Sequence, residues 1–338
     1  MNAPAPGPEA VRFAAVKNMA QLATFALLAG CGITLFAPVW WVADLVANLR
    51  VQLLIALSTM LVCCLLVRKW RLGMVGLMAI AWQTSWLIPL TTKSPARMSL
   101  PVADGLLKVC SVNVLTSNRQ HDRIIAGLRA FDADVVAILE LGTELSDRLE
   151  TDLGEVYPHR VLHPDDGGNF GIGLLSRLPL QNIQIFELSP LPLPSISSDV
   201  EWNDRTVHLV ATHPIPPMSG RYFQSRNQHL RALAQLATEQ RINRPTVPIV
   251  VVGDLNVTPW SPHFRSFQQT SGLIPSFTGP WFNRLQPTWY RWSAFPFGLV
   301  LDHAFNTPDL ICRKRLVGAD SGSDHRPVYV EYAVAEEK

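Results

Sequence analysis

The sequence predicts a layered α/β domain preceded by three transmembrane helices. Three observations lead to this prediction. Charged residues make up only 17 % of the 338 residues, below the share of about 25 % that is usual for soluble domains. Three long runs without charge lie within the first hundred residues, and β-branched runs alternate with amphipathic stretches from residue 106 onward. A hydrophobic content of 48 % excludes a disordered or collagen-like chain.

The formal net charge of +2 is the sum of two unlike parts. Residues 1–98 carry eight basic and two acidic side chains, a net charge of +6, whereas the other 240 residues carry 21 basic and 25 acidic ones, a net charge of −4. A non-specific nuclease gains affinity by neutralising phosphates with Lys and Arg. The negative second part therefore argues mildly against such a nuclease.

The charge-free runs have the lengths of membrane spans. They cover residues 18–43, 51–67 and 72–92, which are 26, 17 and 21 residues long. About 20 apolar residues cross the hydrocarbon core of a bilayer. One such run also fits a buried core helix, but three in succession without a polar face favour a membrane anchor over residues 18–92. Trp40 and Trp41 end the first run, as expected for the interfacial belt.

Basic residues predict how this anchor is oriented. They precede the first run and fill the turn between the second and third runs: Arg12, Lys17, Arg68, Lys69 and Arg71. Because basic residues favour the cytoplasmic side, we expect a multi-pass protein of the cytoplasmic membrane whose second domain lies on the extracytoplasmic side. Asp44 and Arg50, between the first two runs, are expected to form a solvated turn.

Four segments follow from these patterns. The Pro/Ala-rich residues 1–17 are predicted to be a disordered cytoplasmic terminus, and residues 18–92 to be the anchor. Residues 93–104 are predicted to be a linker, and residues 105–335 to be the second domain.

The second domain is predicted from its periodicity, element by element. Apolar, β-branched runs predict strands at 106–115, 133–141, 170–176, 205–213, 248–257, 298–305 and 325–334. Amphipathic spacing predicts helices at 121–131, 146–153 and 221–241. The Pro-rich segments 189–195 and 213–219 are predicted loops. Because strands and helices do not alternate strictly, a layered mixed architecture is favoured over a barrel.

Polar side chains follow the ends of these strands. They are Asn113, Glu140, Thr212 with His213, Asp254 with Asn256, Asp302 with His303, and Asp324 with His325. A single residue of this kind is explained as a cap or turn residue. Six strand ends that share the feature instead predict a polar site on a rigid scaffold.

The residue types narrow the chemistry of that site. Carboxylates beside amides, with no cysteine at these positions, suit a hard divalent cation such as Mg²⁺ or Mn²⁺ better than zinc. Histidines beside acids suit hydrolysis of a phosphoester. The G-x-S-x-G elbow of serine hydrolases and the phosphate-binding P-loop are both absent.

These motifs, in this order, resemble the endonuclease/exonuclease/phosphatase superfamily, which has the DNase I-like fold. They are SVNV at 111–114, ILE at 138–140, LLSRLP at 174–179, GDLN at 253–256, LDH at 301–303 and SDH at 323–325. The resemblance covers residues 106–332 and implies a four-layer αββα sandwich. The three-span front end is similar to membrane-anchored bacterial members related to the YafD group.

The resemblance also implies roles for individual residues. Glu140 is the principal metal ligand, with Asn113 and Asp324 contributing directly or through water. The remaining roles concern the reaction itself. His325 activates or stabilises the attack on phosphorus, Asp302 orients its imidazole, Asp254 positions the water, Asn256 bonds a phosphate oxygen, and His213 donates to the phosphate.

The sequence departs from one pattern in the superfamily and suggests two weaker candidates. Leu115 stands where abasic-site endonucleases carry an acid, which weakens that activity as an interpretation. Arg226, near the start of the long predicted helix, is a candidate substrate contact, with a solvated helix surface as the alternative. Trp289 belongs to the aromatic-rich segment 279–298, which suits either a substrate lip or a strand with a packing loop.

We therefore expect a membrane-anchored, divalent-metal-dependent phosphoesterase, in particular a phosphodiesterase, that directs water in line at phosphorus. The expected partners are a phosphoester substrate and the lipid bilayer, and no protein partner is predicted. Two interpretations of the enzyme stay open, an extracellular nuclease and a sphingomyelinase- or phospholipase-like enzyme. The alternative from another class is a non-catalytic membrane receptor or scaffold that retains the fold.

Overall fold

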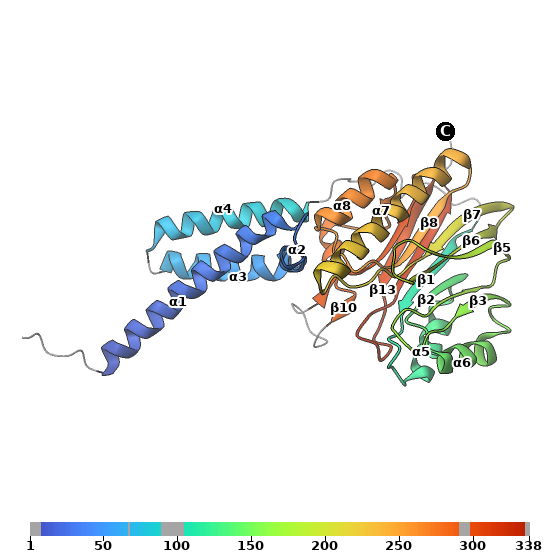
Figure 1. Cartoon of the computed structure of the whole chain (residues 1–338), viewed down its shortest axis with the longest axis horizontal. Coiled ribbons are helices and arrows are strands. Elements are labelled where there is room, and N and C mark those ends of the chain that lie inside the picture. The colour runs from blue at the N-terminus through green and yellow to red at the C-terminus, as the bar shows by residue number, and fades with distance from the viewer. Residues whose placement is uncertain (1–7, 67, 89–104, 291–297, 335–338) are drawn as a thin grey trace, which may run out of the picture. The chain divides into compact units, whose positions relative to one another are not determined.

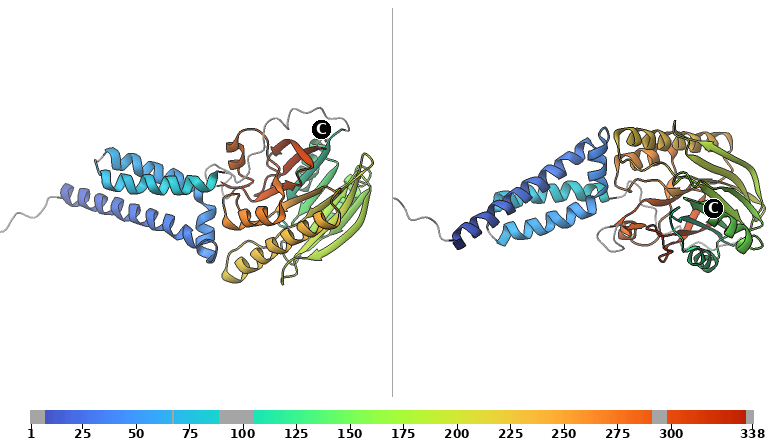
Figure 2. Two further views of the ribbon diagram at one scale, coloured as in Figure 1. Left: turned by 90° about the horizontal axis from the view of Figure 1, so that it is seen from above. Right: turned by 60° about the horizontal axis from the view of Figure 1, so that its bottom comes forward.

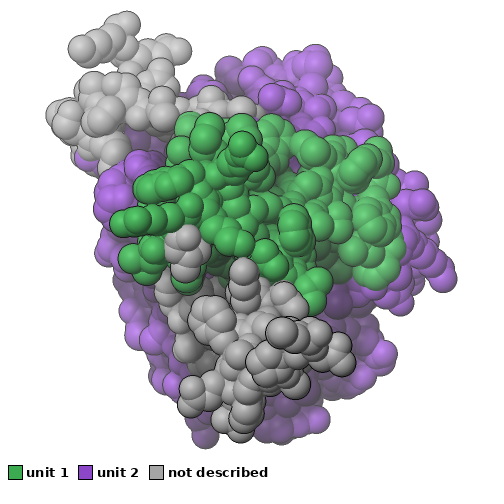
Figure 3. Space-filling model, turned by 90° about the vertical axis from the view of Figure 1, so that its left-hand side faces the viewer, with its two compact units in different colours: residues 1–88 green, residues 89–338 purple. Residues whose placement is uncertain are grey.

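The computed structural model describes residues 8–66, 68–88, 105–290 and 298–334. The chain divides into two compact units, residues 1–88 and 89–338, which Figure 3 colours separately. The expected linker, residues 93–104, lies outside the described residues.

The described part of unit 1 consists of helices and the short turns between them (Figure 1). Its elements are α1 (Pro8–Ile33), the 3₁₀ helix η1 (Thr34–Phe36), α2 (Trp41–Asn48), α3 (Arg50–Leu66) and α4 (Trp70–Leu87). The terminus expected to be disordered is helical from residue 8 onward, and residues 1–7 lie outside the described part. The reason is local, because a proline at the first helical position is followed by helix-forming residues.

The first predicted span is not one straight helix. The chain bends after η1 and resumes as α2, beyond Pro38, which has no N–H with which to continue a helix. Within the described residues, no single helix is both long and apolar enough to cross a bilayer, so three transmembrane helices are not supported. One pair, Gln21–Phe36 and Trp41–Asn48, meets the length and composition requirement together, with a bend of 115°.

The turn expected to be solvated is buried. Asp44 and Arg50 are both 0 % exposed, because a single residue separates α2 from α3 and leaves no open loop. The Arg50 guanidinium donates to Gln83 and lies 4.7 Å from the centroid of the Trp86 ring. Polar groups thus lie in the interior of this helical unit.

Unit 2 contains two six-stranded sheets. In order across the first sheet, the strands are β13 (Leu310–Val317), β14 (Val328–Val334), β1 (Leu107–Asn113), β2 (Val135–Leu139), β4 (Ile172–Ser176) and β3 (His159–His163). In the second sheet they are β5 (Leu180–Glu187), β6 (Pro194–Trp202), β7 (Arg205–Ala211), β8 (Ile249–Asp254), β12 (Asp302–Asn306) and β9 (Ile274–Pro275). A small ribbon pairs β10 (Trp289–Tyr290) with β11 (Gly298–Leu299), and η3 (Trp281–Leu285) precedes it.

The sheets form the two inner layers of a four-layer sandwich (Figure 2). Helices α5 (His121–Phe131) and α6 (Thr143–Leu153) cover the first sheet, and α7 (Gly220–Asn243) and α8 (Pro262–Ser271) cover the second. Alternate residues of a strand face opposite layers. Val109 of β1 therefore lies in the core between the sheets, whereas Cys110 packs under α5 and α6. This αββα architecture is the one expected from the sequence.

Several elements were not predicted from the sequence: β3, β5, β6, β9 and α8. Strand β5 has an almost fully exposed run, so it lacks the apolar signal of a buried strand. Strand β6 begins at Pro194, inside a Pro-rich segment expected to be a loop. Proline is tolerated there because it is the first residue of its strand.

The buried carboxylate of Asp199, in the second sheet, links β6 to β5, to β7 and to the residue that follows α7. Asp199 of β6 accepts a hydrogen bond at 2.9 Å from Arg244, which follows α7, and its second carboxylate oxygen forms an ion pair with the same guanidinium at 2.9 Å. It also accepts from Asn182 of β5 at 2.8 Å and pairs with His208 of β7 at 2.8 Å. Burial raises the pKa of Asp199, but the donors outweigh burial and lower the pKa to about 2.

We predict that Asp199→Asn lowers the free energy of unfolding at pH 7 by about 2 kcal/mol. This is the free energy that corresponds to the difference between a pKa of about 2 for Asp199 in the folded chain and about 4 in the unfolded chain. Because the folded pKa is the lower one, this stabilisation is present above pH 4 and is lost as the pH falls toward 2. Urea unfolding of both proteins across this pH range measures the difference.

Asp204→Asn is the matched control, since Asp204 is exposed in the turn between β6 and β7. Equal unfolding free energies for Asp199→Asn and the wild type at pH 7 would contradict the prediction.

Candidate active site

The polar strand ends meet because of how the strands are paired. β1 and β2 run parallel in the first sheet, as do β7 and β8 in the second, so both pairs end at the same edge of their sheets. β12 and β14 run antiparallel to β8 and β1, which brings the residues before or at their starts to that edge. Asp302, the first residue of β12, is paired with Asp254, the last residue of β8.

A glycine permits the close packing beside Asp254. A Cβ atom on Gly253 would lie 1.9 Å from the carbonyl oxygen of Thr212, which precedes His213. Gly253 also has a φ of +153°, a conformation that L residues rarely adopt. The first residue of the GDLN motif therefore has a structural role, because it lets β8 and the end of β7 approach each other.

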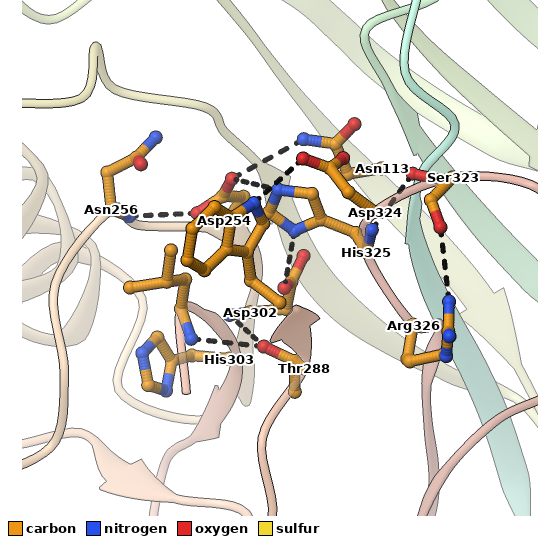
Figure 4. Close-up of polar contacts among 12 residues, drawn as sticks. Asn113, Asp254, Asn256, Thr288, Asp302, His303, Ser323, Asp324, His325 and Arg326 are labelled. Atoms are coloured by element: carbon orange, nitrogen blue, oxygen red, sulfur yellow. Dashed lines mark hydrogen bonds and ion pairs between the residues drawn. The ribbon is translucent and has the colours of Figure 1, made fainter. Parts of the chain in front are cut away.

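The Asp254 carboxylate is the centre of the site (Figure 4). Its Oδ2 atom lies 3.4 Å from Asn113 Nδ2 and 3.5 Å from Nε2 of both His213 and His325. Its Oδ1 atom accepts the backbone N–H of Asn256 at 2.9 Å. Four predicted site residues from both sheets thus surround one buried carboxylate.

His325 is held from its other side by Asp302. Its Nδ1 atom lies 2.8 Å from Asp302 Oδ2, and Nδ1 and Nε2 therefore face two different acids. The backbone N–H of Asp302 donates to Thr288 Oγ1 at 2.9 Å. The neighbouring His303 faces away and bonds the carbonyl oxygen of Val257, as expected from the alternation of a strand.

The charges of the site favour an ion pair. Burial lowers the pKa of His325, but the charges of Asp302 and Asp254 outweigh burial and raise the pKa to about 10. For Asp254, burial raises the pKa, yet the two nearby histidines hold the pKa well below its usual range. The site therefore combines an ionised carboxylate with a protonated imidazole at neutral pH.

Three carboxylates of the site, those of Asp302, Glu140 and Asp324, have one bonded and one unpartnered oxygen among the described residues, and for Asp302 the unpartnered atom is Oδ1. Glu140 Oε1 accepts from Asn113 Nδ2 at 2.8 Å, and Asp324 Oδ2 accepts from the Trp289 indole at 2.8 Å. Glu140 Oε2 and Asp324 Oδ1 are buried without a hydrogen-bond partner among the described residues. Buried carboxylate oxygens with no donor suit a hard divalent cation, so these residues fit Mg²⁺ or Mn²⁺.

A second group also has the spacing of a metal site. Ligand atoms of Asp254, Asp302 and His325 lie within 4.8 Å of one another. His325 already bridges the two acids of this group, however, with Nδ1 2.8 Å from Asp302 Oδ2 and Nε2 3.5 Å from Asp254 Oδ2. Glu140 Oε2 and Asp324 Oδ1 have no such contacts among the described residues, so Glu140 and Asp324 are kept as candidate ligands.

Glu140 adopts a conformation that is unusual for its residue type. Its φ is +59°, in the left-handed region, directly after β2. Such a conformation costs about 1–3 kcal/mol and persists only where surrounding contacts enforce it. The Thr116 hydroxyl, at 3.1 Å, donates to the Glu140 carbonyl and helps to hold this turn.

The Arg226 side chain is buried beneath the site and does not lie on its surface. It is 0 % exposed, which differs from both the expected substrate contact and its solvated alternative. Its guanidinium donates to the carbonyl oxygen of Asn256 and to Asn227 Oδ1, each at 2.7 Å. Asn256 has a φ of +49° and donates its amide to the Pro214 carbonyl oxygen at 2.9 Å, so Arg226 supports a strained turn.

Two residues in the site have roles that the sequence analysis missed. The Phe170 ring packs against the imidazole of His213, with ring centroids 5.3 Å apart and an interplanar angle of 40°. Thr288 accepts the N–H groups of Leu301 and Asp302, at 3.0 and 2.9 Å. The order Pro-Thr-Trp before the Asp302 strand was visible in the sequence, but no periodicity marked its contacts.

The sequence matches the model of the Endonuclease/Exonuclease/phosphatase family over residues 110–325. The chain belongs to this family. Its members are hydrolases that act on phosphoesters, and the chain is such an enzyme. The matched range begins in β1 and ends at His325, so it includes every residue of the site described above. The comparison with curated proteins finds no match.

Solved structures with this fold come from several organisms. D. rerio TDP2 complexed with a single-strand DNA product is 17 % identical, over 68 % of this chain and 100 % of that chain, with a TM-score of 0.55. The human Nocturnin catalytic domain with bound sulfate is 18 % identical, over 71 % and 100 %, with a TM-score of 0.55. The endonuclease/exonuclease/phosphatase from Beutenbergia cavernae is 21 % identical, over 69 % and 72 %, with a TM-score of 0.56. At these identities the likeness is one of fold.

We predict that Arg226→Met lowers kcat/KM for a phosphodiester by about 10²-fold, because loss of the bond to the Asn256 carbonyl lets the Asp254–Asn256 turn shift. Hydrolysis of bis-p-nitrophenyl phosphate by the purified full chain measures this change.

Arg231→Met on the same helix is the control, because Arg231 is exposed. Thermal unfolding of both variants separates local displacement from loss of the fold. A folded Arg226→Met variant with wild-type kcat/KM would refute the positioning role.

Proposed function

We propose that the chain is a divalent-metal-dependent phosphodiesterase in which water attacks phosphorus in line. The observation that carries this proposal is the pair of buried, unpartnered carboxylate oxygens, Glu140 Oε2 and Asp324 Oδ1, in the same site as the Asp254–His325–Asp302 chain. Hydrolysis of a phosphoester requires metal ligands, an ionised carboxylate and a positively charged hydrogen-bond donor, and the site contains candidates for all three.

The chain's own residues divide the work of the reaction. Asp254 stays ionised between His213 and His325, so its carboxylate can accept a hydrogen bond from a water molecule and orient it. His325, held by Asp302, offers a charged N–H to a phosphoryl oxygen as negative charge builds up in the transition state. His213 offers a second donor under the Phe170 ring.

Glu140 and Asp324 would hold the cation, with Asn113 orienting Glu140 through its amide. A bound Mg²⁺ or Mn²⁺ supplies Lewis-acid polarisation of a phosphoryl oxygen and lowers the pKa of coordinated water. A non-catalytic receptor would not require these carboxylates and histidines to be arranged around one site, so we do not favour that alternative.

We predict that the full chain hydrolyses bis-p-nitrophenyl phosphate with Mg²⁺ or Mn²⁺ and loses this activity with EDTA. Glu140→Gln and His325→Gln should each lower kcat by about 10²–10⁴-fold, because they remove a ligand charge and a charged donor. Initial rates at saturating substrate and metal measure the loss.

Glu144→Gln is the matched control, since Glu144 lies on exposed α6 surface and pairs with Arg119. The substrate class is then found by comparing sphingomyelin, phospholipids, single-stranded DNA and inositol phosphates. Absence of hydrolysis across this whole panel, with metal present, would overturn the enzymatic proposal for this chain.

We further propose that unit 1 attaches the enzyme to a membrane. The proposal is supported by the distribution of side chains in unit 1, where large apolar side chains are exposed and polar side chains are buried, the reverse of a protein in water. Of the 26 large hydrophobic side chains that are exposed among the described residues, 18 lie between Leu22 and Ile88. Arg50, Gln83 and Asp44 are meanwhile buried at 0 % exposure. A helical unit that is apolar outside and polar inside suits a lipid environment.

The basic residues of unit 1 extend this proposal to its orientation. Arg68 and Arg71 flank the turn between α3 and α4, which favours a cytoplasmic position for that turn and an extracytoplasmic position for unit 2. This is the orientation expected from the distribution of basic residues along the sequence.

We predict that the full chain sediments with membranes and resists extraction by carbonate but not by detergent, because its outer apolar side chains contact lipid. Immunoblots of the fractions measure this. Met74→Lys with Met78→Lys, on the exposed face of α4, should weaken retention.

Ile183→Lys with Ile185→Lys, on the exposed strand β5 of unit 2, is the matched control. Full release of the wild type by carbonate would contradict the anchor. An inactive C-terminal alkaline phosphatase fusion would contradict the orientation.

A further inference from the structure

The Asp324 carboxylate is held by an uncharged donor. The Trp289 indole N–H donates to Asp324 Oδ2 at 2.8 Å, and Asp324 Oδ1 is buried without a hydrogen-bond partner among the described residues. One oxygen is thereby fixed and the other is left for a ligand. Glu140 shows the same division, with Asn113 as its uncharged donor.

The backbone holds this contact in register. Trp289 forms an isolated antiparallel bridge with His325. On either side, Tyr290 donates its N–H to the Asp324 carbonyl oxygen at 2.9 Å, and Arg326 donates its N–H to the Thr288 carbonyl oxygen at 2.6 Å. The indole is therefore presented to Asp324 by two paired segments and not by a free loop.

The guanidinium of Arg326, two residues after Asp324, bonds other groups. The Arg326 guanidinium bonds the Ser323 carbonyl oxygen at 3.1 Å and Asp320 Oδ2 at 3.2 Å, as Figure 4 shows for Ser323. A guanidinium on Asp324 would neutralise the carboxylate and weaken its attraction for a cation. An indole N–H orients the carboxylate and leaves its full negative charge in place.

We propose that Trp289 is a positioning residue for cation binding: its indole N–H orients Asp324 so that Oδ1 serves as a ligand for Mg²⁺ or Mn²⁺. The inference rests on the proposed function. It differs from the substrate contact expected from the sequence, which would use the aromatic face. The two roles are separable, because Trp289→Phe keeps an aromatic ring and removes only the N–H donor.

The test is a titration of the full chain in detergent with Mn²⁺, in which electron paramagnetic resonance measures free Mn²⁺. We expect Trp289→Phe to raise the Kd for Mn²⁺ by about 10- to 100-fold, the usual effect of losing a partner that orients a metal ligand. The Mn²⁺ concentration for half-maximal hydrolysis should rise by the same factor, and KM for bis-p-nitrophenyl phosphate at saturating Mn²⁺ should not change.

Trp281→Phe is the matched control, because Trp281 lies in η3 and is 54 % exposed. In an Asp324→Asn background, Trp289→Phe should have no further effect on the Kd, since the oriented carboxylate is already gone. If Trp289→Phe does not fold, the wild type still provides a measurement. Addition of Mg²⁺ should then shift tryptophan emission in the wild type and in Trp281→Phe, and not in Asp324→Asn.

An unchanged Kd for Mn²⁺ in folded Trp289→Phe overturns the proposal, and a raised KM in that case assigns Trp289 to the substrate instead. An emission shift that persists in Asp324→Asn overturns it as well. A wild-type chain that neither binds Mn²⁺ nor hydrolyses the phosphodiester contradicts the proposed function itself, which is a different result.

Discussion

The buried Asp254 carboxylate is the interaction on which the site depends. It ends β8 of the second sheet, yet it contacts Asn113 and His325, which belong to the first sheet and to the segment before β14. An ionised carboxylate inside a protein persists only when donors surround it, so the two sheets must stay aligned at this edge. The charges of two histidines keep the pKa of Asp254 low and keep the site in one arrangement.

Near that carboxylate, two residues of the site adopt unfavourable backbone conformations that orient their side chains. Glu140 and Asn256 both have positive φ values although neither is glycine. Their neighbours compensate, since Thr116 bonds the Glu140 carbonyl oxygen and Arg226 bonds the Asn256 carbonyl oxygen. The same logic governs Asp324, where Trp289 fixes one carboxylate oxygen. Polar groups of the site are thus oriented by hydrogen bonds from neighbouring residues.

Unit 1 follows a different physical rule. Its described helices expose large apolar side chains and bury Arg50 and Gln83, which bond each other. In water this arrangement would expose apolar surface and bury a charge, both at a cost in free energy. The low charge fraction of the whole chain therefore has two sources, an apolar helical surface in unit 1 and long buried strands in unit 2.

The sequence by itself determined the layered α/β class, most buried strands and the set of polar strand ends, because apolar β-branched runs and short motifs are local signals. The four-layer αββα arrangement was implied by the family resemblance of those motifs. The sequence did not reveal β5, whose exposed residues lack an apolar pattern, or the bend near Pro38. The roles of Arg226, Trp289 and Thr288 were decided only by the tertiary structure. Each acts through a hydrogen bond to a residue 14 to 35 positions away, and no pattern along the chain encodes such a contact.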